Sequence, residues 1–239
     1  MATHNGEKYI KEQVDSILCQ LAHDDEIIVS DDGSTDGTLL ILQGYKDNRI
    51  KIFHFQQPGH AKKASLNVAR NFENALKRAK GDYIFLSDQD DKWMKDKVDI
   101  CSNLLRGNDL VIHNLRLVDS ELVDSGKNFY NESNRIRFHN ILSIREEYPG
   151  CAMAFRREML HFILPFPDNL VSHDYWIGQL CEFYGRAAYV DTPLIYYRIR
   201  KESVSHSANN TFIYKIQYRL RQLRHLSLRI VKINLKMNV

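Results

Sequence analysis

The 239-residue sequence predicts an α/β domain built around a largely parallel sheet. Short apolar runs alternate with segments of helical periodicity, which is the pattern of strands joined by crossover helices. Acidic clusters at 31–32 and 88–91 each follow one of these apolar runs. Because ligands of open parallel sheets bind outside the carboxyl ends of the strands, we expect both clusters to lie at one ligand site.

Local signals bound the expected elements. Asn5-Gly6 supplies a turn before the first helix, Gly81 ends a basic helix, and Pro149-Gly150 breaks the chain before an apolar run. The segment 129–147 is polar and is expected to be a long loop with short helical turns. The expected helices cover 7–21, 34–43, 65–79, 156–162 and 174–184, and the expected strands cover 26–30, 50–55, 82–87, 110–113, 151–155, 187–190 and 194–197.

The composition is that of an ordinary globular protein, with 44% apolar and 26% charged residues. A net charge of +3 is too small to imply nucleic acid as a partner. The four cysteines are widely spaced, so each is expected to be a small buried residue in a reducing, cytoplasmic setting. No run reaches the ~18 to 20 apolar residues of a membrane-spanning helix. The N-terminus also lacks the apolar region of a signal peptide, so neither segment is expected.

The run 88–91 places three carboxylates, Asp88, Asp90 and Asp91, at the end of an expected strand. Like charges packed together raise one another's pKa unless a cation neutralises them, and Mg²⁺ and Mn²⁺ prefer oxygen ligands. The pattern therefore favours a divalent-metal site that also holds substrate phosphates. The alternative is a solvated acidic turn that caps the segment at Trp93.

Two other interpretations of the acidic clusters fail on spacing. A phosphatase motif would need Thr or Val at the position of Lys92. A calcium-binding loop that began at Asp32 would need Glu at its twelfth position, where Gln43 stands, and would follow a helix and not a strand.

Four motifs in this order resemble the family 2 glycosyltransferases. The resemblance covers about residues 1–205, and the DQDD-x-W form is particularly similar to the rhamnosyltransferase-like branch. The motifs are THNG at 3–6 with IIVSDDGSTDGT at 27–38, GDYIFLSDQDDKW at 81–93, PGCAMAFRR at 149–157, and HDYW at 173–176.

This resemblance implies a GT-A fold, with a nucleotide-sugar half at about 1–110 and an acceptor half at about 111–205. Relatives carry an apolar run before the segment that matches Met1-Ala2-Thr3. The first strand of the nucleotide half is therefore expected to be truncated here, at a cost in ladder hydrogen bonds and core contacts.

The resemblance also implies roles for individual residues on the donor side. Thr3 and Asp31 or Asp32 would contact the base and ribose. Asp88 and Asp90 would hold the ribose and the metal–diphosphate, with Asp91 as a helper. Three basic residues, Arg70, Arg198 and Arg200, would lie near the donor diphosphate. Arg200 stands where relatives often have His, and it can neutralise phosphate but cannot ligate a metal.

On the acceptor side, Asp174 matches the general base that deprotonates the acceptor hydroxyl. The alternative role for Asp174 is a helix N-cap. Gly150, His173 and Trp176 are expected to line the acceptor site.

The function implied is inverting transfer of a sugar, with Mg²⁺ or Mn²⁺, from a UDP- or dTDP-sugar to a hydroxyl of a glycan or lipid-linked glycan in cell-surface polysaccharide synthesis. Rhamnosyl transfer is suggested by the DQDD-x-W segment. Two alternatives stay open: a nucleotidyltransferase, for which Thr3–Lys8 has too few glycines, and a non-catalytic sugar-nucleotide or glycan-binding module. Exchanging Asp174 for Asn separates them, because only a transferase should lose transfer and keep donor binding.

The segment 206–239 is expected to form a basic amphipathic helix. From Thr211 to Val239 there are seven Lys or Arg residues and no Asp or Glu. Apolar residues at helical spacing share this segment with the basic ones. The helix could lie on an anionic membrane surface, which would place the protein at the inner face of the plasma membrane, or it could pack on protein.

Overall fold

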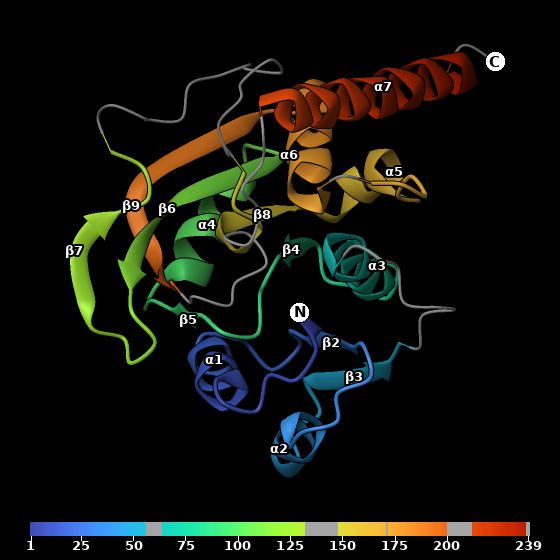
Figure 1. The fold of residues 1–239 in the computed structure, drawn as a ribbon. Helices are drawn as coiled ribbons and strands as arrows, with labels where there is room; N and C mark the ends of the chain where they lie inside the picture. The colour runs from blue at the N-terminus through green and yellow to red at the C-terminus, as the bar shows by residue number, and fades with distance from the viewer. Residues whose placement is uncertain (56–63, 132–147, 171, 200–211, 238–239) are drawn as a thin grey trace.

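The computed structural model describes residues 1–55, 64–131, 148–170, 172–199 and 212–237 (Figure 1). Within them two sheets lie one below the other in the view, and helices cover both. This arrangement confirms the expected α/β class.

The first sheet is parallel, as the alternation of strands and helices predicts. It has the order β1-β2-β3, with β1 at Ala2–Thr3, β2 at Ile27–Asp31 and β3 at Ile50–His54. The connections are helices α1 (Ile10–Leu18) and α2 (Thr38–Gly44). All five residues of β2 are buried, because this strand is covered on both faces.

The second sheet is mixed, which the sequence pattern does not predict. Its order is β4-β8-β6-β9-β5, and β7 (Asp124–Asn128) pairs with β6. The β6–β9 pair is parallel, whereas the other pairs are antiparallel. The bounds are Tyr83–Phe85 for β4, Lys92–Trp93 for β5, Leu110–Val118 for β6, Met153–Arg156 for β8 and Ala187–Arg198 for β9.

Four further helices pack against the two sheets or beside them. Helix α3 (Ala64–Leu76) follows β3 and lies on β1 and β2 of the first sheet, and α4 (Lys97–Leu105) follows β5. Helix α5 (Leu160–Ile163) and helix α6 (His173–Tyr184) share the largest core cluster with β6 and β8. The apolar side chains of this cluster join these helices and strands to α3 and β4 in one core.

Three expectations about elements need correction. The two short strands expected at 187–190 and 194–197 are one strand, β9, whose register against β6 shifts between Val190 and Pro193. Proline cannot donate to the ladder, so the irregularity falls at Pro193. The helix expected at 156–162 is the end of β8, a 3₁₀ turn at Arg157–Met159 and α5. Short strand β5, strand β7 and helix α4 carry too little periodicity to be expected.

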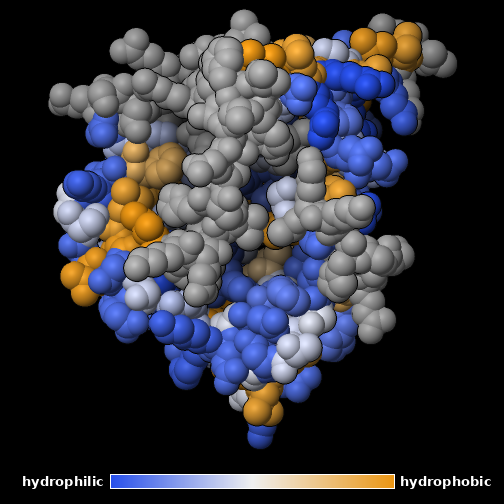
Figure 2. Space-filling view, in the orientation of Figure 1, coloured by the Kyte–Doolittle hydropathy of each residue, from blue (hydrophilic) through white to orange (hydrophobic). Residues whose placement is uncertain are grey.

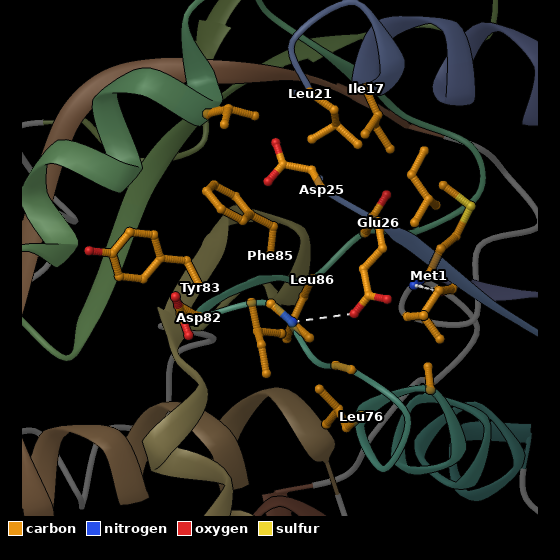
Figure 3. A pocket seen from close by; sticks show the side chains of 18 of the residues that line it. Met1, Ile17, Leu21, Asp25, Glu26, Leu76, Asp82, Tyr83, Phe85 and Leu86 are labelled. Atoms are coloured by element: carbon orange, nitrogen blue, oxygen red, sulfur yellow. Dashed lines mark hydrogen bonds between the residues drawn. The ribbon is translucent and has the colours of Figure 1, made fainter. Parts of the chain in front are cut away.

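Strand β1 has two residues and is the shortest of the first sheet. It pairs with Ser30 and Asp31, and the Met1 amino group donates to Ile28 O (2.8 Å). Ile27 lies beyond this contact and pairs with Ile50 of β3 on its other side. A cavity of about 370 Å³ lies there, between the facing edges of β2 and β4 (Figure 3). Its apolar wall includes Ile17, Leu76, Ala79, Ile84 and Leu86. It is a gap between the two sheets, and its lining includes Ser87 at the start of the acidic loop.

The C-terminal helix α7 (Phe212–Met237) lies across α6 (Figure 1). Its buried residues Leu226 and Ile233 face the domain. Leu226 belongs to the same core cluster as Trp176, so α7 is packed on α6 and the core beneath it. None of the helices in the described part of the chain is long and apolar enough to cross a membrane.

Candidate active site

The acidic loop 88–91 joins β4 to β5 and is held in place by glutamines. The Gln89 side chain accepts a hydrogen bond from His4 N (2.8 Å) and donates one to His4 O (3.0 Å). Gln13 Nε2 donates to Ser87 Oγ (2.7 Å) at the start of the loop. A Cβ at Gly6 would lie 2.5 Å from Gln89 Oε1, so the glycine of the THNG motif makes room for this contact. The N-terminal loop and the acidic loop are therefore one unit.

The cluster 31–32 is placed beside the same unit by the end of β2. Asp31 is buried, and its carboxylate accepts hydrogen bonds from Thr3 Oγ1 (3.0 Å) and Ser34 N (2.9 Å). Asp32 N donates to Thr3 O (2.9 Å). Thr3, Asp31 and Asp32, the residues expected at the base and ribose, are thus together, with Asp31 shaping the turn from within.

Asp88, Asp91 and Cys151 form the candidate metal centre among the described residues. One ligand atom from each lies within 4.8 Å of the others. Burial and the negative charges of Asp90 and Asp174 raise the pKa of Asp88 to about 7. Burial and the neighbouring charges of Asp90 and Asp88 raise the pKa of Asp91 well above its usual range. The loop thus holds carboxylates close together, and a bound cation would offset their electrostatic repulsion.

The donor atoms of this centre fit a hard divalent cation. Asp91 Oδ2 is buried and has no hydrogen-bond partner among the described residues. Carboxylate oxygens are the ligands that Mg²⁺ and Mn²⁺ prefer. Burial raises the pKa of the Cys151 thiol well above its usual range, so the sulfur stays protonated and adds no thiolate.

A buried lysine lies behind the acidic loop. Lys97, at the start of α4, donates from Nζ to Cys151 O (2.8 Å), and its ammonium lies 4.2 Å from the centre of the Trp93 ring. Burial lowers the pKa of Lys97 to about 8, while the negative charges of Asp91 and Asp88 act in the opposite direction. Lys97 is therefore a counter-charge beneath the centre and ties the acidic loop to the loop of Cys151.

Arg198, expected near the diphosphate, braces the acidic loop from inside the protein. It is 4% exposed. Its guanidinium donates to Asp90 O (2.7 Å) and pairs with Glu12, and its backbone N–H donates to Asp91 Oδ1 (3.1 Å). The guanidinium also lies over the Tyr9 ring at 4.6 Å. These contacts engage Arg198 with protein groups and fix the backbone at Asp90 and Asp91.

Asp174 lies in the first turn of α6, facing the loop of Gly150. Its Oδ1 is 2.7 Å from His173 Nε2, and the Asp174 charge raises the pKa of His173 against the opposite effect of burial. The His173 ring stacks on Phe72 of α3 (4.4 Å between centroids). A Cβ at Gly150 would lie 2.2 Å from Asp174 Oδ1. Because Asp174 also raises the pKa of Asp88, the expected base and metal residues are within electrostatic range.

The remaining expected site residues are Trp176, Arg70 and Arg200. Trp176 is buried, and its indole N–H donates to Ile163 O (2.9 Å), so its ring belongs to the core behind the site. Arg70 is partly buried on α3, one position before Asn71, which donates to Thr3 O (3.1 Å). Arg200 lies outside the described residues.

Sequence reasoning missed the residues that support the loop. Gln13, Lys97 and Glu12 contact the loop or its partners and do not stand out by type or spacing, and Gln89 joins the loop to His4. Gln89 alone had a signal, because it lies inside the DQDD run.

The chain is similar to known glycosyltransferases. The sequence profile described as Glycosyl transferase family 2 matches residues 1–164. The putative glycosyltransferase EpsH of Bacillus subtilis is 30% identical over 85% of this chain and 61% of its own length. The dTDP-rhamnosyl transferase RfbG of Shigella flexneri is 29% identical over 89% of this chain and 75% of its own.

Solved structures share the fold. S. aureus TarS in complex with UDP-GlcNAc has a TM-score of 0.65 at 21% identity, over 87% of this chain and 59% of that one. Glucosyl-3-phosphoglycerate synthase of Mycobacterium tuberculosis, in complex with Mn²⁺ and UDP-glucose, has a TM-score of 0.57 at 18% identity, over 91% and 76%. The chain thus spans less than two thirds of EpsH and TarS. The match to the family model over residues 1–164 shows that the chain belongs to glycosyl transferase family 2.

Proposed function

We propose that this chain transfers a sugar, with inversion, from a nucleoside-diphosphate donor to a hydroxyl of a glycan or lipid-linked glycan acceptor in polysaccharide synthesis. The observation that carries the proposal is the meeting of Asp88 and Asp91 in one centre within electrostatic range of Asp174. A diphosphate site beside a carboxylate base is what displacement of a nucleoside diphosphate by a hydroxyl requires.

Asp88 and Asp91 would hold Mg²⁺ or Mn²⁺, with Asp90 adding negative charge. The cation would supply positive charge to the diphosphate that leaves with the bonding electrons. The Mn²⁺ complex of the mycobacterial synthase supports this assignment. Thr3 and Asp32, at the ends of the neighbouring strands β1 and β2, would contact the nucleoside.

Asp174 would accept the proton of the attacking hydroxyl. The acceptor oxygen then forms its bond to the anomeric carbon as the bond from that carbon to the diphosphate oxygen breaks, and attack from the opposite side inverts the configuration. His173, 2.7 Å from Asp174 Oδ1, orients the carboxylate. Gly150 leaves the space that the carboxylate occupies.

For the donor we propose a dTDP- or UDP-sugar, with dTDP-rhamnose first. The support is the name of RfbG, a dTDP-rhamnosyl transferase, and the UDP-GlcNAc complex of TarS. A thermal-shift panel of UDP-, dTDP- and GDP-sugars with and without Mn²⁺ tests the donor class. A shift with one nucleotide that requires Mn²⁺ supports the proposal, and no shift with any of them contradicts it.

The Asp174→Asn variant tests the reaction. It should abolish transfer and keep the affinity for the nucleotide and Mn²⁺, because the amide cannot accept the proton but keeps the shape of the side chain. Unchanged transfer by this variant would refute the role of Asp174.

We also propose that α7 rests on an anionic membrane surface. Its outward face carries Leu220, Leu228, Val231 and Leu235, each at least 57% exposed. Exposed Arg224 and Lys232 share this face, and Figure 2 shows hydrophobic surface beside strongly hydrophilic surface along the helix. A helix with apolar residues among basic ones suits the boundary between lipid headgroups and acyl chains.

A further inference from the structure

Helix α7 contacts the short segment that carries Asp174. Helix α6 begins at His173, after the N-cap Ser172, whose hydroxyl accepts a hydrogen bond from Tyr175 N (3.4 Å). Asp174 therefore lies in the first turn, between the cap and Tyr175. Two adjacent residues of α7, Tyr218 and Arg219, reach the two sides of this turn.

Arg219 fixes the side chain of Tyr175. Its Nη2 donates to the Tyr175 hydroxyl (2.7 Å), and the guanidinium carbon lies 4.3 Å from the centre of the Tyr175 ring. Its Nη1 donates to Oε1 of the buried Gln222 (2.9 Å), which sets the plane of the guanidinium. A guanidinium that both stacks and donates restrains its partner in position and in orientation.

Tyr218 reaches the other side of the turn. Its phenol and the hydroxyl of the cap residue Ser172 share a hydrogen bond. Burial raises the pKa of Tyr218 to about 12, and the negative charge of Asp174 contributes in the same direction. Tyr218 is therefore a neutral group within electrostatic range of the Asp174 carboxylate.

The contacts continue from Tyr175 to the loop that Asp174 faces. Tyr175 meets Tyr148 edge to face, with 5.1 Å between ring centroids. Tyr148 packs so closely on Gly178 that a Cβ there would lie 2.2 Å from Tyr148 Cδ1. Tyr148 leads through Pro149 to Gly150, whose backbone borders the carboxylate. Contacts from Tyr175 through Tyr148 thus connect α7 with the first turn of α6 and with the loop of Gly150, the two segments that border Asp174.

We propose that Arg219, together with Tyr218, is a positioning residue for Asp174, so that α7 is part of the acceptor side of the site. The inference rests on the proposed role of Asp174 as the base. Neither residue needs to touch substrate: Arg219 acts through Tyr175 and Tyr148, and Tyr218 acts through Ser172. Displacement of a reacting group by about 1 Å can cost on the order of a hundredfold in rate.

The test compares Arg219→Gln and Arg219→Lys with Arg221→Gln, an exposed arginine on the same helix. Three quantities are measured in the full chain: the Kd for UDP with Mn²⁺ by calorimetry, the pKa of His173 by NMR, and kcat with the nucleotide sugar that gives the largest thermal shift. Thermal unfolding of each variant is followed in parallel.

For Arg219→Gln we expect an unchanged Kd and a kcat lower by roughly ten- to a hundredfold. The pKa of His173 should fall, because the Asp174 charge that raises it is no longer held beside the ring. Arg219→Lys keeps the positive charge but loses the planar guanidinium with its several donors, so its kcat should lie between those of Arg219→Gln and the wild type. Arg221→Gln should match the wild type in all three.

Wild-type kcat and wild-type His173 pKa in a folded Arg219→Gln variant would overturn the inference. A parallel loss of UDP binding would mark general unfolding of that variant. If that variant does not fold, the same measurements are made on Tyr175→Phe, which keeps the ring and removes the hydroxyl that Arg219 contacts. Wild-type kcat and wild-type His173 pKa in Tyr175→Phe would then overturn the inference. If Asp174→Asn still transfers sugar, only the proposed role of Asp174 as the base is refuted. The pKa of His173 in the Arg219 variants would still report whether α7 holds the first turn of α6 in place.

Discussion

Gly150 and Asp174 fit together so closely that a Cβ at position 150 would lie 2.2 Å from Asp174 Oδ1. Real Cβ atoms do not approach an oxygen to this distance, so the two residues cannot both keep their places if position 150 carries a side chain. The glycine of the PGCA motif is therefore explained by the carboxylate that it accommodates, 24 positions later in the chain.

The first prediction concerns Gly150→Ala. The added methyl group should push the Asp174 carboxylate from its position beside His173 and lower kcat by on the order of a hundredfold. The affinity for UDP with Mn²⁺ should stay close to that of the wild type, since Thr3 and Asp88 lie on other elements. Initial rates and calorimetry measure the two effects.

Gly44→Ala is the matched control, because a Cβ at Gly44 meets nothing within 4 Å. It lies in helix α2 and should leave kcat unchanged while stability rises by about 0.4–1 kcal/mol. Full activity in Gly150→Ala would show that the carboxylate does not need its present position.

The second prediction concerns the pH dependence of cation binding. With the pKa of Asp88 raised to about 7, a proton competes with the cation below that pH. The affinity for Mn²⁺ should therefore rise as the pH is raised through about 7, and calorimetry of Mn²⁺ binding across this range measures the slope. Asp88→Asn should weaken binding and flatten the slope, whereas Glu121→Gln, at an exposed carboxylate, should change neither.

The third prediction follows from the same carboxyl group and concerns stability without a cation. An ordinary aspartate has a pKa of about 4, whereas that of Asp88 in the folded state is about 7. Between about pH 4 and pH 7, Asp88 is therefore protonated in the folded state and ionised in the unfolded state. The contribution of Asp88 to the free energy of unfolding is therefore present below about pH 4 and is lost as the pH rises through about 7. Urea unfolding should show that Mn²⁺ stabilises the protein more at pH 8 than at pH 6, and an equal effect at both would contradict the assignment.

Local patterns predict the strand ends and the acidic residues well, because these depend on near neighbours. The run 27–31 is apolar and ends in aspartate, and β2 is found there, parallel to its neighbours. The run 82–87 likewise gives β4 and delivers Asp88 to the loop. The family match of residues 1–164 confirms the resemblance on which the wider expectations depend.

The contacts of Arg198 could not be predicted, because they join residues far apart in the chain. Its partner Glu12 is 186 positions away and Asp90 is 108 positions away. A motif gives the type of residue but not whether its charge faces ligand or protein. For the same reason, the burial of Trp176 and the contact of Arg219 with Tyr175 depend on how α7 packs, which no local pattern encodes.

The fourth prediction concerns the cavity between β2 and β4. Ala75, on α3, is 5% exposed and lines this cavity. Ala75→Met should fill part of it with a flexible apolar side chain and raise the free energy of unfolding by about 0.5–2 kcal/mol. Ala69→Met, on the same helix but inside the packed core, should instead destabilise by about 1–3 kcal/mol. Urea unfolding of both variants measures the difference, and destabilisation by both would show that the cavity does not accept side-chain atoms.

The last prediction concerns the outward face of α7. The wild-type chain should co-sediment with vesicles that contain phosphatidylglycerol and less so with neutral ones, because each basic residue near anionic lipid contributes about 1 kcal/mol. Replacing Leu220, Leu228 and Val231 together by Ser should weaken binding by roughly tenfold or more, since full burial of one such side chain is worth about 1.5–3 kcal/mol. Replacing Leu40 and Val123, which are more exposed but lie outside α7, should change nothing. If the wild-type chain does not bind the anionic vesicles, the outward face of α7 faces something other than lipid.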